Sequence, residues 1–152
     1  MEDAKRTVII EAATRVFAEK GYQYATMSEI AKESGIATGL TYSYFRNKLD
    51  ILFSIILAFW KEMNHLSNER LPPIRDPFDK LFVVLHNFED LLVKDEHTLC
   101  RAKVLHEALP HIVMIKEKDL QEKRQEILAA NKQFLVLIDE IIADGQKQGV
   151  FD

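Results

Sequence analysis

The sequence predicts an all-α protein, and three observations support this fold class. Apolar residues recur at helical spacing in several separate stretches of the 152-residue chain. Residues typical of helix ends, namely glycine, proline and capping side chains, separate these stretches. Alternating β-branched runs between turn signals, which would indicate strands, do not persist. We therefore expect amphipathic helices that pack against one another around a shared core.

The first fifty residues predict three helices. Gly21 follows an apolar face that repeats at helical spacing and provides a C-terminal stop. Thr26 and Glu29 have the spacing of a capping box, in which each side chain bonds the backbone N–H of the other residue. Gly35 then ends the second helix. These helices are expected over residues 4–20, 27–34 and 38–45.

Four longer helices are predicted in the rest of the chain. Pro72 stops the first of them, and Asp76 followed by Pro77 starts the next, because proline suits the first helical position. Pro110 is expected to end the third, and apolar residues every seven positions mark the last. The first is expected to run from the Asn47 cap to about residue 70, and the second from residue 77 to a charged break at 94–96. The third is expected over residues 98–109, and the fourth from about residue 120 to 145.

Composition limits the classes of function. The 20 basic and 24 acidic side chains give a net charge of −4, which argues against a general nucleic-acid binder, although residues 1–50 are balanced. The lone Cys100 excludes a disulfide framework and suits a reducing cytoplasm. The N-terminus lacks the apolar core of a signal peptide, and the longest apolar stretch, 49–60, is too short to span a bilayer. A cytoplasmic protein without a membrane partner is expected.

Two short helices joined by a glycine turn, between Thr26 and Lys48, predict a helix-turn-helix. The outer face of the second of these helices is expected to carry hydrogen-bonding groups that are small or flat enough for a DNA major groove. Tyrosine hydroxyls and Lys48 can bind phosphates. The residues expected on that outer face are Thr38, Thr41, Tyr42 and Ser43.

From about residue 5 to residue 65 the sequence resembles the TetR family of bacterial transcription regulators. The residues that carry the resemblance are Phe17-Ala-Glu-Lys-Gly21-Tyr22, Thr26, Ile30-Ala31, Gly35, Gly39, Tyr42, Tyr44-Phe45 and Asn47-Lys48. It implies a DNA-binding head at 1–65, joined by a long helix to a regulatory and dimerisation bundle at 66–152. That bundle is expected to be partial, because relatives usually continue into two more helices.

The resemblance also implies roles for individual residues. Thr26 and Lys48 are expected to hold phosphates at the starts of two helices. The residues expected to face DNA are Thr38, Gly39, Leu40, Tyr42, Ser43 and Tyr44. The resemblance further implies a homodimer on double-stranded operator DNA and a small effector ligand.

The regulatory region offers weaker signals. A ligand pocket is expected at Phe82, His86, Phe88, Arg101, Leu105 and His106. An acyl-CoA or fatty acid is the preferred ligand, and a hydrophobic drug the next. No metal, cofactor or enzymatic activity is expected, because His106 and His111 are separated by Pro110 and no catalytic motif occurs. We thus predict a repressor that is released by its ligand. The alternative is a helical interaction protein that retains the helix-turn-helix scaffold without binding an operator.

Overall fold

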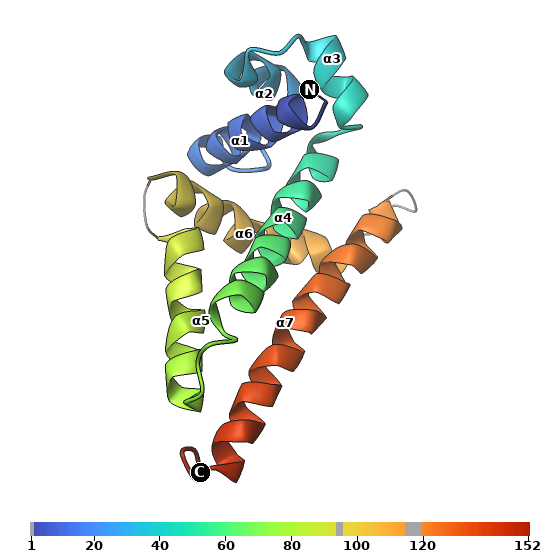
Figure 1. Ribbon diagram of the computed structural model, residues 1–152. Helices are drawn as coiled ribbons and strands as arrows, with labels where there is room; N and C mark the ends of the chain where they lie inside the picture. Colours follow the sequence, from blue (N-terminus) through green and yellow to red (C-terminus); the bar gives the residue numbers. More distant parts are fainter. Residues whose placement is uncertain (1, 94–95, 115–119) are drawn as a thin grey trace.

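A computed structural model describes residues 2–93, 96–114 and 120–152, and within these ranges it contains seven helices and no strand (Figure 1). The helices are α1 (Glu2–Lys20), α2 (Met27–Ser34), α3 (Thr38–Tyr44), α4 (Lys48–Arg70), α5 (Pro77–Leu92), α6 (Glu96–Met114) and α7 (Gln121–Lys147). The prediction of an all-α fold is confirmed.

The helices form a small head and a longer bundle (Figure 1). α1, α2 and α3 make the head, in which α1 packs against α2 and α2 against α3. α4 starts in the head and runs down into the bundle, where it packs against α5, α6 and α7. α6 lies across the bundle beneath α1 and packs against it. Residue 65, the predicted end of the head, lies inside α4, so no loop separates the two parts.

The apolar core extends across the head and the bundle. One cluster contains Ile30 and Phe45 of the head together with Val104 of α6 and Ile127 of α7. A second cluster fills the far end of the bundle between α4, α5 and α7. Trp60 of α4 packs against both clusters. Head and bundle therefore share one apolar core through the first cluster.

The predicted helix starts are confirmed by their caps. Thr26 and Glu29 form the complete capping box at α2, and Gly35 ends that helix with φ +68°. The Asn47 side chain accepts a hydrogen bond from the Asp50 backbone N–H at 2.9 Å. Asp76 caps α5, with proline in its first turn. Local side-chain chemistry therefore sets these boundaries.

α6 corrects one boundary, because it was expected to end before Pro110 and instead continues to Met114. A proline inside a helix removes one backbone donor and crowds the carbonyl four residues earlier, which weakens the helix at that turn without preventing it from continuing. The side chain of His111, the second residue of the histidine pair considered above, lies outside the described residues. Within the described residues, no group of three or more His, Cys, Asp or Glu side chains could hold a metal ion.

Two rows of apolar side chains lie on the surface of the bundle. On α5 they are Phe78, Phe82 and Leu85, and on α7 they are Leu128, Leu135 and Ile142. Each residue of the α7 row comes directly after a buried apolar residue of the same helix, namely Ile127, Phe134 or Ile141. The helix α7 is therefore apolar both on its buried side and on the neighbouring exposed side. Exposed apolar rows of this kind mark surfaces that other protein elements cover.

Candidate DNA-binding site

α2 and α3 are joined by a tight turn whose backbone bonds fix the angle between them. The Ile36 N–H donates to the Ala31 carbonyl at 3.1 Å, and the left-handed Gly35 makes this reversal possible. Ile30 and Phe45 are buried beneath the pair. Packing and turn together leave α3 at the head end of the molecule (Figure 1). The last turn of α3 also borders a hollow that it shares with Glu122 and Glu126 at the start of α7.

Five of the predicted DNA-facing residues lie on the exposed side of α3. They are Thr38, Gly39, Leu40, Tyr42 and Ser43, which we call the α3 face. Tyr42 is the most prominent large side chain, with 52% of its surface exposed. The Ser43 hydroxyl donates to the Leu40 carbonyl at 2.7 Å and keeps its acceptor capacity. The face thus offers hydroxyl groups, a bare backbone at Gly39 and one apolar contact.

Thr41 does not belong to this face, and the expectation that it points outward is wrong. Its side chain is fully buried, and its hydroxyl donates to the Ala37 carbonyl at 3.3 Å. Thr41 lies one helical turn before Phe45, so both residues point to the side that packs on the head. Because the Thr41 hydroxyl has this backbone hydrogen bond, a threonine is tolerated at a buried position.

Tyr44 and Thr26 are held by the protein itself. Tyr44 is half-buried and packs against the core of the head. The Thr26 hydroxyl accepts a hydrogen bond from the Glu29 N–H at 3.2 Å and donates one to Glu29 Oε2 at 2.9 Å. Its exposed position nevertheless leaves this helix start open to an outside group.

Lys48 is bound by the loop between α1 and α2. Its Nζ donates to the carbonyl oxygens of Tyr22, Gln23 and Ala25 at 2.8, 2.8 and 3.1 Å. It also lies 4.7 Å from the centre of the Tyr22 ring, a cation–π distance. The three ammonium donors are therefore all used inside the head. Sequence reasoning missed this role because the acceptors are backbone carbonyls more than twenty residues away.

Ion pairs neutralise much of the charge on the head. Lys20 Nζ lies 2.5 Å from Glu29 Oε1, and Arg15 Nε lies 2.8 Å from Glu33 Oε1. The bonds from Lys20 and Thr26 lower the pKa of Glu29 to about 2, and the same Glu29 raises the pKa of Lys20. Glu29 is therefore ionised at neutral pH and ties the start of α2 to the end of α1.

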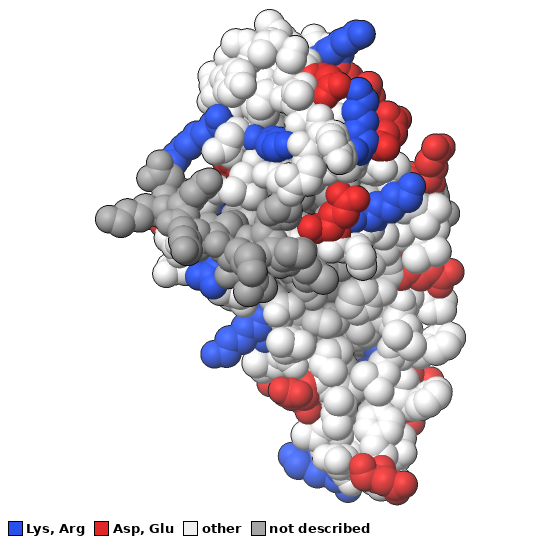
Figure 2. Space-filling model, turned by 180° about the vertical axis from the view of Figure 1, so that it is seen from behind, with Lys and Arg blue, Asp and Glu red and all other residues white. Residues whose placement is uncertain are grey.

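The surface charge is correspondingly mixed. Figure 2 shows the molecule from behind, where basic and acidic side chains of the described residues lie among one another on this face.

The bundle contains a cavity of about 420 Å³ between α4, α5 and α7. Its walls are half apolar and half polar, and the ion pair of Lys80 with Asp144, at 3.5 Å, forms part of them. Lining residues include Ser67, Leu71, Lys80, Leu137, Ile141 and Asp144. Sequence reasoning missed this site because residues from three separate helices form it.

None of the six predicted pocket residues lines that cavity, and the structure does not bring them together elsewhere among the described residues. Phe82 and His86 are exposed on α5, with ring centres 4.8 Å apart. Arg101 bonds Glu62 at 3.0 Å, and His106 is exposed. Phe88 and Leu105 pack against the core. Their role as ligand contacts stays a prediction.

A helical head that exposes α3 beyond a capped α2 defines a helix-turn-helix regulator, and comparison with known proteins gives its family. Residues 9–55 match the model described as "Bacterial regulatory proteins, tetR family". The "Fatty acid metabolism regulator protein" of Bacillus subtilis is 33% identical over 141 residues, which make up 93% of this chain and 68% of that protein. The chain belongs to the TetR family of bacterial transcription regulators.

Solved structures agree with this assignment. The transcriptional regulator FadR from Bacillus subtilis, in complex with stearoyl-CoA, matches with a TM-score of 0.71 and 29% identity, over 96% of this chain and 73% of that one. The fatty acid degradation regulator FadR from Bacillus halodurans matches with a TM-score of 0.72 and 28% identity, over 95% and 69%. In the part of the chain that the structure describes, no helix is long and apolar enough to cross a membrane.

Proposed function

We propose that the protein is a homodimeric repressor that leaves a palindromic operator when it binds an acyl-CoA. The exposed α3 face carries this proposal, since its five residues are exposed together and a Cβ built on Gly39 would meet nothing within 4 Å. A relative of 29% identity is described in complex with stearoyl-CoA, which supports this ligand class. A fatty acid or a hydrophobic drug is the next choice.

On DNA, we assign Thr38, Gly39, Leu40 and Ser43 to the base edges. Tyr42 is exposed enough to reach a phosphate with its hydroxyl, and Thr26 offers a second phosphate contact at the start of α2. Lys48 contacts a phosphate if one of its three loop bonds is exchanged for the DNA, and Tyr44 contributes at the edge of the face. A dimer presents two such helices, with half-sites about 34–36 Å apart or a multiple of that distance.

The mixed surface charge favours one competing function, a helical interaction protein that does not bind an operator. A mobility shift on the DNA upstream of the protein's own gene separates the two. We expect binding whose log affinity falls linearly with log salt, and a two-fold symmetric footprint. Tyr42→Ala should weaken this binding and leave the thermal unfolding temperature unchanged. Absence of binding, or protection of a single asymmetric half-site, would reject the repressor.

A further inference from the structure

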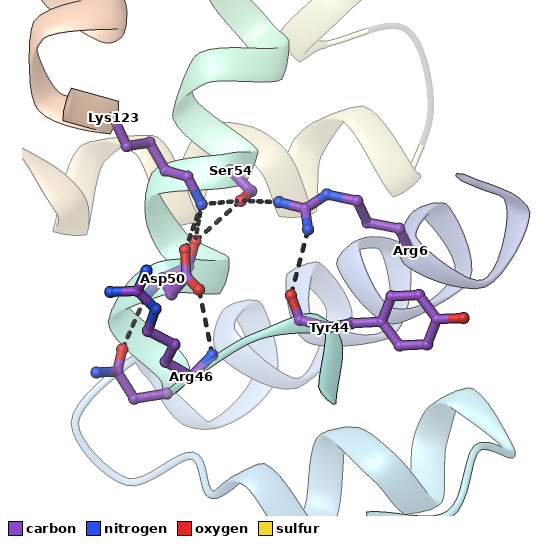
Figure 3. Close-up of polar contacts among 7 residues, drawn as sticks. Arg6, Tyr44, Arg46, Asp50, Ser54 and Lys123 are labelled. Carbon is purple, nitrogen blue, oxygen red and sulfur yellow. Dashed lines mark hydrogen bonds and ion pairs between the residues drawn. The ribbon is translucent and has the colours of Figure 1, made fainter. Parts of the chain in front are cut away.

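A chain of polar contacts joins α7 of the bundle to the end of the recognition helix α3 (Figure 3). Lys123 of α7 forms an ion pair with Asp50 of α4, and its Nζ also donates to the Ser54 hydroxyl at 3.0 Å. Asp50 and Ser54 are buried. A buried carboxylate is costly unless a cation is bonded to it, and Lys123 is the cation that pairs with the buried Asp50.

The same two residues of α4 hold the turn that follows α3. The second carboxylate oxygen of Asp50 accepts a hydrogen bond from the Arg46 N–H at 3.2 Å. The Ser54 hydroxyl accepts a bond from Arg6 Nη2 at 3.2 Å, and Arg6 Nη1 donates to the Tyr44 carbonyl, also at 3.2 Å. Backbone groups on both sides of Phe45 are thus bonded to the network (Figure 3).

Phe45 itself is fixed between these bonds. Its ring is almost fully buried, and the Arg6 guanidinium lies 4.4 Å from the ring centre. The Ser54 hydroxyl completes its bonding by donating to the Asp50 carbonyl at 2.9 Å, so its one donor and two acceptor positions are all used. The network therefore has little freedom to rearrange without losing a bond.

Lys123 is the one member of this network that the bundle contributes among the residues drawn in Figure 3. Apolar contacts between head and bundle also exist, through Val104, Leu120 and Ile127. Apolar packing is non-directional and tolerates a small rotation, whereas hydrogen bonds weaken steeply when their angle changes. A second directional bond between head and bundle runs from the Tyr22 N–H to Glu107 Oε2 of α6, at 3.1 Å, on the side of the α1–α2 loop. The bonds of Lys123 are the ones that act on the end of α3 itself.

We propose that Lys123 is a positioning residue that fixes the direction of α3 relative to the bundle, and thereby selects the spacing of the two half-sites that a dimer accepts. The part of this proposal that concerns half-site spacing rests on the proposed function, whereas the part that concerns the direction of α3 does not. α7 also borders the bundle cavity through Leu137, Ile141 and Asp144. A ligand that displaces α7 therefore moves Lys123 and releases the head.

The orientation is tested without DNA. In a Cys100→Ser background, Lys32→Cys in the head and Asp139→Cys on α7 carry spin labels, and pulsed electron resonance measures their distance distribution. We expect a narrow distribution that broadens with Lys123→Met, which keeps the side-chain stem, and stays narrow with Lys123→Arg. Lys132→Met, at an exposed lysine of the same helix, is the matched control. A distribution that Lys123→Met leaves unchanged would overturn the proposal.

A second measurement tests the consequence for DNA. Operators selected with the unmodified protein are lengthened or shortened by one base pair between their half-sites. We expect Lys123→Met to reduce the discrimination among these spacings by about tenfold, while its affinity for an isolated half-site stays unchanged. An equal loss on half-site and full operator would overturn the positioning role.

Failure of the repressor function and failure of the Lys123 role give different results. If the unmodified protein binds no DNA, the repressor function is wrong, and the spin-label distances still decide the role of Lys123. If Lys123→Met does not fold, the double variant Asp50→Asn with Lys123→Met takes its place, because it leaves no unpaired buried charge. Narrow distances in that variant would likewise reject the proposal.

Discussion

Gly39 lies in the first turn of α3 with no partner that requires a glycine. Its φ is not positive, and a Cβ built on it would meet nothing within 4 Å. Glycine in a helix costs about 0.5–1 kcal/mol relative to alanine, so the protein carries this residue at the expense of stability. Under the proposed function, DNA approaches the backbone at Gly39, where any side chain would stand between the two.

We therefore expect Gly39→Ala to raise the free energy of unfolding by up to about 1 kcal/mol. The same change should weaken operator binding by about tenfold or more, because loss of one good base contact costs about 1–3 kcal/mol. Urea unfolding and a mobility shift measure the two effects. Equal operator affinity in both proteins would show that DNA does not approach this backbone.

Lys48 holds the α1–α2 loop, and the proposed function gives it a phosphate contact as well. Two measurements on one variant examine the two roles separately. Lys48→Met loses the bonds to three loop carbonyls, and we expect the free energy of unfolding to fall by about 1–3 kcal/mol. Amide exchange should accelerate at residues 21–25, which the ammonium holds. If Lys48 also contacts a phosphate, the slope of log affinity against log salt becomes about one unit shallower. Unchanged stability would contradict the loop-holding role seen in the structure.

At the scale of elements, α1 and α2 are joined by an exposed ion pair that responds to acid. The pKa of Glu29 is lowered to about 2 from the ordinary value of 4.5, chiefly by its bond from Lys20. A lowered carboxyl pKa stabilises the fold above the ordinary value, and the contribution disappears as the pH falls toward 2.

Glu29→Gln should therefore lower the melting temperature at pH 7, and the difference from the unmodified protein should shrink between pH 4.5 and pH 2. Melting curves recorded by circular dichroism across this range measure the effect. High salt should reduce the difference at pH 7, since the Lys20–Glu29 pair is at the surface. If the difference in melting temperature does not change with pH, the Glu29→Gln loss comes only from the weaker capping of α2 by the glutamine amide, and the ion pair with Lys20 contributes nothing.

Most element boundaries could be predicted because local chemistry sets them. Thr26, Gly35 and Asp76 act on backbone groups within a few residues, so their sequence context is sufficient. Pro110 was misleading because packing of α6 outweighs one lost hydrogen bond. In a helix as short as α3, the period alone did not reveal that Thr41 is buried.

The candidate site was predictable only in part. The α3 face follows from helical spacing and the family resemblance, and five of its residues are exposed together. The partners of Lys48 and the pair of Lys123 with Asp50 join residues 23 or more positions apart. Such contacts depend on how the helices pack, which spacing along the chain does not specify. The cavity between α4, α5 and α7 was missed for the same reason.

At the scale of the whole molecule, α4 is the helix that runs from the head into the bundle and joins the two. It begins at Lys48 in the head and ends at Arg70 beside the far part of the bundle. Trp60, the protein's one tryptophan, lies near its middle and contacts Phe59 and Phe134 at ring distances of 5.1 and 5.6 Å. It therefore reports any shift of α4 against α7 through its fluorescence.

We expect stearoyl-CoA to change Trp60 emission, to raise the melting temperature and to weaken operator binding. A ligand that binds the DNA-free arrangement more tightly must be bound more weakly when the operator is present, and by the same factor, typically about 5–150-fold. Titrating stearoyl-CoA with and without operator, and operator with and without stearoyl-CoA, measures this factor twice. Octanoyl-CoA serves as the short-chain control. Two unequal factors would mean that a further state is involved, and binding that leaves operator affinity unchanged would reject the ligand-release mechanism.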